Sequence, residues 1–195
     1  MRTANMARAT RETDISLTLN LDGSGRTELS TGVGFFDHML DAFCRFALID
    51  LTLRCKGDLQ VDAHHTVEDV GICLGRAIRE ALGDRAGIRR VGSAYLPMDE
   101  ALAFAAIDIS GRPYLAFQAE FAAPMVGTMD TQLAEEFFRA VAVNAGLTVH
   151  AKVLEGRNDH HRMEALFKAF GLALRDAARL EERVQGVLST KGSLD

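Results

Sequence analysis

Apolar residues alternate with polar ones along some stretches of the chain and recur with helical spacing along others. Ile15, Leu17, Leu19 and Leu21 are separated by single polar residues, which predicts a half-buried β-strand. Further strands are predicted at residues 26–30, 48–54, 101–109, 112–117 and 147–154. Helices are predicted at residues 36–46, 133–145, about 64–82 and about 160–180. The chain therefore alternates strands and helices.

The order of these predicted elements occurs twice. Glu12 precedes the turn at Gly23 by 11 residues, and Glu100 precedes the turn at Gly111 by the same interval. We therefore predict an α+β fold, an α/β sandwich made by internal duplication of two β-β-α-β-α units. The halves are residues 1–91 and 92–195, in one compact unit. Because neither half can easily bury its sheet alone, we expect helix layer to pack on helix layer, or on neighbouring chains.

Composition narrows the class of protein. The net charge of −5 argues against a nucleic-acid partner, and no apolar run is long enough for a membrane span. Residues 1–11 lack the apolar core of a signal peptide. Three cysteines, Cys44, Cys55 and Cys73, match no disulfide or zinc spacing. We therefore expect a cytoplasmic protein with three buried thiols.

Two copies of one motif stand at the start of two predicted helices. Both have the pattern His-His-x-x-Glu: His64, His65 and Glu68 in the first, and His160, His161 and Glu164 in the second. Residues three or four apart share a helix face, so each glutamate lies beside a histidine. Adjacent histidines point about 100° apart, which suits two ions better than one. Imidazole and carboxylate together favour divalent metal ions.

These motifs occur together with four other distinctive runs. They are GFFDHML at residues 34–40, MDE at 98–100, SGRPY at 110–114 and STKG at 189–192. In this combination the chain resembles the imidazoleglycerol-phosphate dehydratase family over residues 11–192. The resemblance implies a fold similar to the second domain of ribosomal protein S5. It also implies two Mn²⁺ ions per active site and a homo-oligomeric shell of 24 subunits that share active sites.

The resemblance further implies a lyase reaction of histidine biosynthesis. D-erythro-imidazole glycerol phosphate, a small-molecule phosphate, loses water to give imidazole acetol phosphate. The proton that must leave is only weakly acidic. Our hypothesis is that both ring nitrogens bind metal, so that an imidazolate-like ring expels hydroxide and forms a diazafulvene. This route needs two metal clusters, and the chain carries two motifs.

Two metal ligands are expected beyond the two motifs. His38 matches the family's Asp-His-Met-Leu ligand. Glu136 stands in the second half where His38 stands in the first, at a position where many relatives carry a metal-binding histidine. By composition alone Glu136 is typical of a helix surface, but a carboxylate oxygen also suits manganese. We therefore expect Glu136 to be a ligand.

The resemblance also implies catalytic and substrate-binding residues. Glu12 is expected to be the acid/base residue, with Asp99 as the second candidate, although Glu12 by itself is typical of an exposed carboxylate paired with arginine. Phosphate binding needs cationic, directional donors, and we expect the tail to order over the phosphate. The expected substrate-binding residues are Glu12, Arg90, Arg112, Lys168, Ser189 and Lys191.

Two other functions stay open at this point. One is a dinuclear metal-dependent hydrolase, although such centres usually carry aspartate-rich bridging ligands and these clusters are histidine-rich. The other is a non-enzymatic shell in which metal ions link subunits, which gives no reason for the arginine and lysine set. The sequence does not determine the metal, nor how the ligands divide between two ions or between chains.

Overall fold

The computed structural model describes residues 2–194. Its first half contains four strands and two helices. They are β1 (Thr3–Ala9), β2 (Thr13–Asn20), β3 (Thr27–Ser30), α1 (Gly34–Ala47), β4 (Asp50–Gly57) and α2 (His64–Leu82). These strands form one sheet in the order β1-β2-β4-β3, in which β3 pairs parallel to β4 and the other pairs are antiparallel.

The second half repeats this plan with one small addition. Its elements are β5 (Val91–Met98), β6 (Ala101–Asp108), β7 (Tyr114–Gln118), β8 (Met125–Val126), β9 (Met129–Asp130), α3 (Leu133–Ala145), β10 (Thr148–Glu155) and α4 (Asp159–Ala178). The main sheet has the matching order β5-β6-β10-β7. The added β8 and β9 pair with each other as a short hairpin between β7 and α3.

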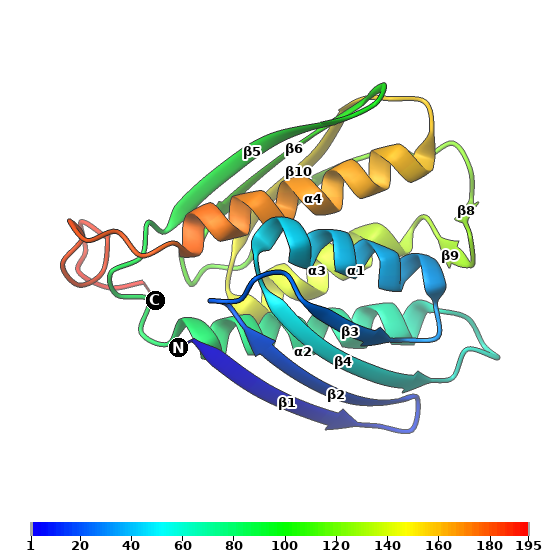
Figure 1. The fold of residues 1–195 in the computed structure, drawn as a ribbon, viewed down its shortest axis with the longest axis horizontal. Helices are drawn as coiled ribbons and strands as arrows, with labels where there is room; N and C mark the ends of the chain where they lie inside the picture. The colour runs from blue at the N-terminus through cyan, green and yellow to red at the C-terminus, as the bar shows by residue number, and fades with distance from the viewer. Residues whose placement is uncertain (1, 195) are drawn as a thin grey trace.

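The four long helices lie between the two sheets (Figure 1). Helix α1 packs on α4, and α2 packs on α3, so the helix layers of the two halves meet as expected. Glycines permit this close approach: a Cβ on Gly75 would lie 2.8 Å from the Val141 carbonyl oxygen, and one on Gly171 would lie 2.5 Å from that of Phe43. Gly75 and Gly171 occupy equivalent positions in α2 and α4. The core is therefore shared by both halves.

The predicted duplicated α+β fold is confirmed, but the first half has one strand more than the sequence predicted and the second half has three more. Besides the β8–β9 hairpin, the unpredicted strands are β1 and β5, each antiparallel at the edge of its sheet. Their sequences, TANMARA and VGSAYLPM, contain small, polar, glycine and proline residues that weaken the alternating apolar signal. The exact boundary between residues 91 and 92 stays a prediction. Cys44, Cys55 and Cys73 are buried free thiols, as expected. Within residues 2–194, no helix is both long and apolar enough to cross a membrane.

Candidate metal and substrate site

Both His-His-x-x-Glu motifs occupy the first turns of helices α2 and α4. The Asn158 side chain caps α4 by accepting hydrogen bonds from the backbone N–H groups of His160, at 2.9 Å, and His161, at 3.3 Å. At α2, Asp62 Oδ1 accepts from the His64 N–H at 2.7 Å. The two imidazole rings of each motif diverge, with ring centroids 6.1 Å apart in both. Neighbouring histidines therefore face different surroundings.

The second motif forms a compact cluster with α1. His38 Nε2 and His160 Nε2 each lie 3.1 Å from Glu164 Oε2. Ligand atoms of these three residues all lie within 4.8 Å of one another. Lys168 Nζ lies 2.6 Å from the other oxygen, Glu164 Oε1. Two imidazoles and one carboxylate so close together fit a single divalent ion.

The charge state of Glu164 suits this role. Burial of the side chain raises the pKa of the Glu164 carboxyl, but the hydrogen bond from Lys168 and the nearby His38 lower it further than burial raises it. The net pKa lies below the usual value, so the carboxylate is ionised at neutral pH and can donate electron pairs to a cation. The Phe35 ring, 5.1 Å from the His160 ring between centroids, forms an apolar wall beside the cluster.

The first motif is more open. His64 Nε2 lies 3.8 Å from Glu68 Oε2, and both side chains are almost half exposed. His64 and Glu136 line one cavity of about 620 Å³ between the start of α2 and the start of α3. Glu136 Oε2 lies 3.9 Å from Arg139 Nε, one helical turn along α3. Glu136 therefore faces the same space as His64, as the repeat predicts.

The other histidine of each motif faces a β-hairpin. His65 Nδ1 lies 3.0 Å from Asp58 Oδ2, and His65 Nε2 lies 3.7 Å from Glu12 Oε1 in the β1–β2 hairpin. The hydrogen bond to Asp58 raises the pKa of His65. Sequence reasoning missed Asp58, because its Gly-Asp context is typical of a turn and gives no sign of the contact with His65.

His161 has matching partners in the second half. Its Nδ1 donates to Glu100 Oε2 at 2.8 Å, and its Nε2 lies 3.7 Å from Asp99 Oδ2 in the β5–β6 hairpin. This hydrogen bond to Glu100 raises the pKa of His161 and holds the pKa of Glu100 well below its usual range. The two catalytic candidates, Glu12 and Asp99, thus occupy equivalent hairpins. Sequence reasoning missed Glu100 as a partner of His161, although its place in the repeat matches that of Glu12.

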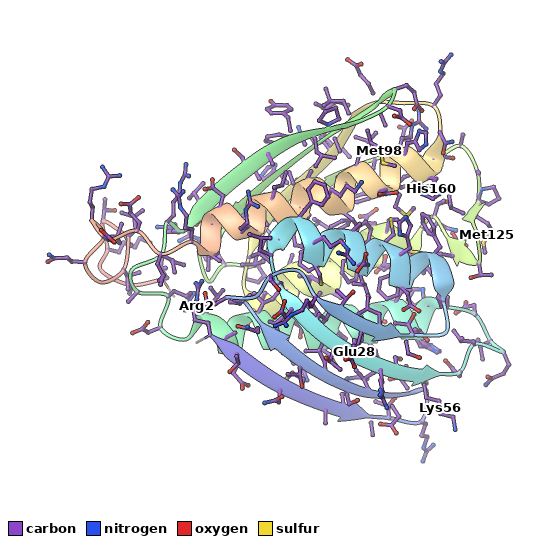
Figure 2. All side chains as sticks on the ribbon, in the orientation of Figure 1. Arg2, Glu28, Lys56, Met98, Met125 and His160 are labelled. Atoms are coloured by element: carbon purple, nitrogen blue, oxygen red, sulfur yellow. The ribbon has the colours of Figure 1, made fainter. Side chains whose placement is uncertain are left out.

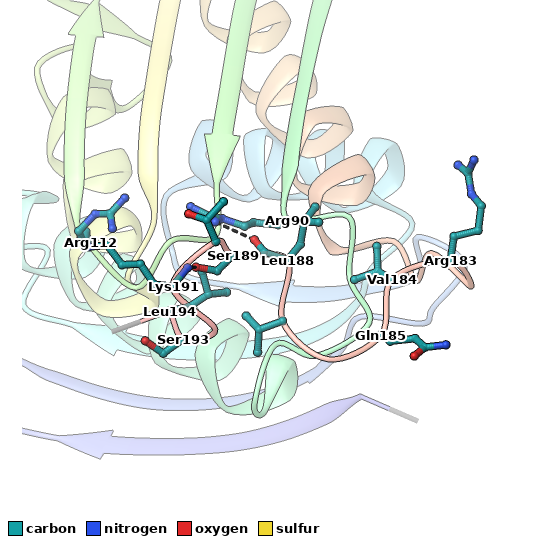
Figure 3. Close-up of a pocket in the computed structure, with 12 residues that line it drawn as sticks. Arg90, Arg112, Arg183, Val184, Gln185, Leu188, Ser189, Lys191, Ser193 and Leu194 are labelled. Atoms are coloured by element: carbon teal, nitrogen blue, oxygen red, sulfur yellow. Dashed lines mark hydrogen bonds between the residues drawn. The ribbon is translucent and has the colours of Figure 1, made fainter.

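The C-terminal tail encloses a basic cavity of about 650 Å³ (Figure 3). Its lining includes Arg90, Arg112, Ser189 and Lys191, all predicted for phosphate binding. Asp108 orients the Arg90 side chain: Arg90 Nε donates to Asp108 Oδ1 at 2.7 Å, and Arg90 Nη2 donates to Asp108 Oδ2 at 2.9 Å. Arg90 Nη1 also donates to the Leu188 carbonyl oxygen at 2.8 Å. The tail residues around Ser189 and Lys191 are therefore placed beside the fixed guanidinium group of Arg90.

The basic cavity and the histidine cluster lie at opposite ends of α4. His160 stands in its first turn, whereas the Arg90 N–H binds the Ala177 carbonyl in its last turn. Figure 2 shows His160 far from the end of α4 where Arg2 lies. At 1.5 Å per residue the 17 positions between residues 160 and 177 span about 25 Å. Lys168, also predicted to bind phosphate, is not in the basic cavity but bonded to Glu164.

A family model described as imidazoleglycerol-phosphate dehydratase matches residues 31–174. The chain belongs to the imidazoleglycerol-phosphate dehydratase family. Curated imidazoleglycerol-phosphate dehydratases from Acetivibrio thermocellus and Symbiobacterium thermophilum are 60% and 62% identical to it over 193 residues. The first alignment covers 99% of each chain, and the second covers 99% of this chain and 93% of the relative.

Solved structures of the imidazoleglycerol-phosphate dehydratase family have the same fold. The enzyme from Staphylococcus aureus is 41% identical with a TM-score of 0.84, and the match covers 92% of this chain and 99% of that one. The enzyme from Pyrococcus furiosus, crystallised with (S)-C348, is 38% identical with a TM-score of 0.83, covering 97% and 100% of the two chains. The resemblance seen in the sequence motifs therefore extends to the whole fold.

Proposed function

We propose that this chain catalyses the dehydration of imidazole glycerol phosphate to imidazole acetol phosphate in histidine biosynthesis. The observation that carries the proposal is the His38–His160–Glu164 cluster, which gives a member of this dehydratase family a set of ligands close enough for one divalent ion. A hydrolase with aspartate-rich bridging ligands is not supported by this histidine-rich set.

Two Mn²⁺ ions per active site are part of the proposal. His38, His160 and Glu164 would hold one, and His64, Glu68 and Glu136 offer the same donor types for another. His65 and His161, which point away from their neighbours, complete the proposed ligand set. Bound metal supplies Lewis-acid polarisation of the substrate's ring and a template that orients it.

The residues of the chain have separate proposed tasks. Glu12 moves the proton of the glycerol carbon, since its carboxylate faces His65 and is half exposed. Asp99 holds the matching place beside His161 as the second candidate. Arg90, Arg112, Ser189 and Lys191 bind the phosphate, for which guanidinium groups offer two parallel N–H donors. Lys168 is proposed to bind substrate from beside Glu164.

The separation within one chain supports shared active sites. The basic cavity and the histidine cluster lie about 25 Å apart along α4, much farther than an imidazole with a three-carbon phosphate chain can reach. One substrate molecule can therefore use both only if they come from different chains. This supports an assembly in which the metal ligands of one chain meet the basic cavity of another. We propose that this assembly is a shell of 24 subunits in the cytoplasm.

The role of Glu12 is tested by Glu12→Gln, which keeps the shape of the side chain but removes its ability to take a proton. We expect turnover to be abolished while metal content, measured by elemental analysis, stays at the wild-type level. Near-normal turnover would remove Glu12 from the reaction. Hydrolytic release of phosphate from the substrate without loss of water would instead favour the hydrolase.

The shared-site proposal is tested by removing metal. Histidine must be neutral to bind metal, and its ordinary pKa is about 6.5, so mild acid or a chelator should release the ions. Size-exclusion chromatography should then show a smaller particle that regains its size and activity when Mn²⁺ is restored. A particle whose size is unaffected by chelator would contradict metal bridging between chains.

The role of the tail is tested by deleting residues 189–195. Loss of Ser189 and Lys191 from the basic cavity should raise the KM for substrate strongly. Metal content should stay unchanged, because the deletion removes none of the proposed metal ligands. An unchanged KM would count against phosphate binding by the tail.

A further inference from the structure

Two glutamates at equivalent positions of the repeat have different surroundings. Glu100 in the β5–β6 hairpin ties that hairpin to the start of α4. Its carboxylate accepts from the backbone N–H groups of Arg157, at 3.0 Å, and Asn158, at 2.8 Å, and from His161 Nδ1 at 2.8 Å. The Glu12 carboxylate in the β1–β2 hairpin makes no hydrogen bond to any residue from 2 to 194, and 53% of the side chain is exposed. Glu12 therefore does not anchor its own hairpin.

A buried polar network anchors the first hairpin instead. Asp69, in the second turn of α2, accepts a hydrogen bond from Thr13 Oγ1 at 2.5 Å and binds the Arg8 guanidinium. Arg8 also lies 3.4 Å from Thr13 Oγ1 through the same terminal nitrogen. Only 7% of the Asp69 side chain is exposed. Arg8 comes from β1 and Thr13 opens β2, so one carboxylate holds both strands of the hairpin to the helix.

The second half has no such network at the matching positions. The residues equivalent to Arg8, Thr13 and Asp69 are Leu96, Ala101 and Ala165. All three are buried and apolar. The polar anchor therefore occurs only in the half whose hairpin glutamate is left unbonded.

We propose that Arg8, Thr13 and Asp69 form a positioning unit, which holds the Glu12 hairpin on α2 so that the Glu12 carboxylate stays free for proton transfer. Thr13 directly follows Glu12, and the Glu12 carbonyl accepts from the Asp58 N–H at 3.0 Å, so Glu12 is held on both sides. Replacing a buried charged network by apolar residues is often neutral or stabilising, so net stability does not by itself account for this network. The inference rests on the proposed role of Glu12.

The first test is Asp69→Asn, which removes the charge that binds Arg8 but keeps the size of the side chain. A catalytic group displaced by about 1 Å loses up to roughly 100-fold in rate, so we expect kcat to fall by about 10- to 100-fold. KM and metal content should stay within about twofold, because the basic cavity and the metal ligands are not altered. A rise in KM with unchanged kcat would overturn the proposal.

The second test transplants the apolar residues of the second half as the triple variant R8L/T13A/D69A. Apolar replacement of a buried charged network is often neutral or stabilising, so the variant should fold and assemble with an unfolding midpoint near that of the parent. Its kcat should nevertheless fall as in Asp69→Asn. A folded triple variant with parental kcat would show that any packing suffices and would refute a positioning role.

A matched control uses a similar network at the other end of the same sheet. Asp50 accepts from the Ser24 hydroxyl at 3.3 Å and from the Arg26 guanidinium at 3.1 Å. Asp50→Asn should leave kcat within about twofold.

Glu12→Gln separates the positioning role of Arg8, Thr13 and Asp69 from the proposed role of Glu12. If that variant is inactive and Asp69→Asn is normal, only the positioning role fails. If Glu12→Gln keeps normal turnover, the role of Glu12 itself fails.

Discussion

The two His-His-x-x-Glu motifs start equivalent helices with the same spacing, but their glutamates have different surroundings. The Glu164 side chain is 9% exposed and lies between His38, His160 and Lys168. The Glu68 side chain is 43% exposed, and the basic side chain beside it is His64, whose Nε2 lies 3.8 Å from Glu68 Oε2. The difference arises outside the motif, because neighbouring helices and the residue four positions further along supply the partners of each glutamate.

These outside partners differ in charge between the halves. Helix α1 brings His38 to Glu164, whereas α3 brings Glu136 into the space that His64 faces. Four residues after each glutamate stand Lys168 in the second motif and Ile72 in the first. The second motif is thus balanced within one chain, and the first collects acidic groups that lack an equal number of cations. We infer that the first motif depends more on added cations and on other chains.

The largest expected effect comes from removing each glutamate in turn. Glu164→Gln and Glu68→Gln should each lower metal content by one ion per chain and reduce turnover by at least about 100-fold, equivalent to about 3 kcal/mol. Their effects on folding should differ. Glu164→Gln leaves Lys168, whose side chain is 18% exposed, without the carboxylate that it binds, so it should also cost about 1–3 kcal/mol of unfolding free energy.

Glu68→Gln changes an exposed side chain and should cost less than about 0.5 kcal/mol. Urea unfolding of both variants after metal removal measures this contrast. Equal losses of stability would show that the two motifs are equivalent within the chain.

Much of the fold is predictable from the sequence, since strong periodicity covers most elements. The alternation at Ile15, Leu17 and Leu19 placed β2 correctly, and residues 133–145 match α3. Strands β1 and β5 were not predicted because their sequences, TANMARA and VGSAYLPM, contain small, polar, glycine and proline residues that weaken the alternating apolar signal. Strands β3 and β7 also lie at sheet edges but were predicted, so edge position alone is not the reason.

The candidate site likewise has some features that the sequence predicts and others that it does not. Helix geometry correctly predicts that His64 and His65 diverge, because only local spacing is involved. The partners of His65 and His161, which are Asp58 and Glu100, depend on how hairpins and loops meet the helices. Such contacts between distant segments have no periodic signal. The separation of Arg90 from the histidine cluster is likewise visible only once α4 is placed.

The next prediction concerns Glu136, the counterpart of His38. Glu136→Ala should lower the occupancy of one metal site per chain and nearly abolish turnover, because the first motif loses an oxygen ligand. Glu136→His should keep both ions and activity, since it gives the first motif the ligand type that His38 gives the second. Elemental analysis with a dehydratase assay measures both. If the alanine variant keeps two ions and normal activity, Glu136 is a surface residue and the equivalence with His38 does not extend to metal binding.

The smallest expected effect concerns the loop that precedes β3 in the first half and the loop that precedes β7 in the second. A different side chain holds each loop in place. Asp50 opens β4, and its Oδ1 accepts from the Ser24 and Arg26 N–H groups at 2.8 and 2.9 Å. Thr148 opens β10 at the equivalent position, and its hydroxyl donates to the Arg112 carbonyl at 3.0 Å. One half therefore uses a charge where the other uses a neutral hydroxyl. The backbone hydrogen bonds from Ser24 and Arg26 hold the pKa of Asp50 well below its ordinary 3.8.

Asp50→Asn and Thr148→Val should therefore respond differently to pH. At pH 7 the first should cost about 1–2 kcal/mol, because asparagine keeps an acceptor oxygen, and the second about 0.5–1 kcal/mol, toward the lower end of what hydrogen bonds to charged and neutral groups contribute. For a chain of this length each kcal/mol lowers Tm by about 2–4 °C. A carboxyl whose pKa is depressed by folding stabilises the fold above its unfolded pKa, near 3.8, and loses this contribution as pH falls through the folded pKa. The deficit of Asp50→Asn should thus shrink below about pH 4, whereas that of Thr148→Val should stay constant. Thermal unfolding of metal-free protein from pH 7 down to pH 3 measures both, and a constant Asp50→Asn deficit would show that the negative charge of Asp50 does not stabilise its loop.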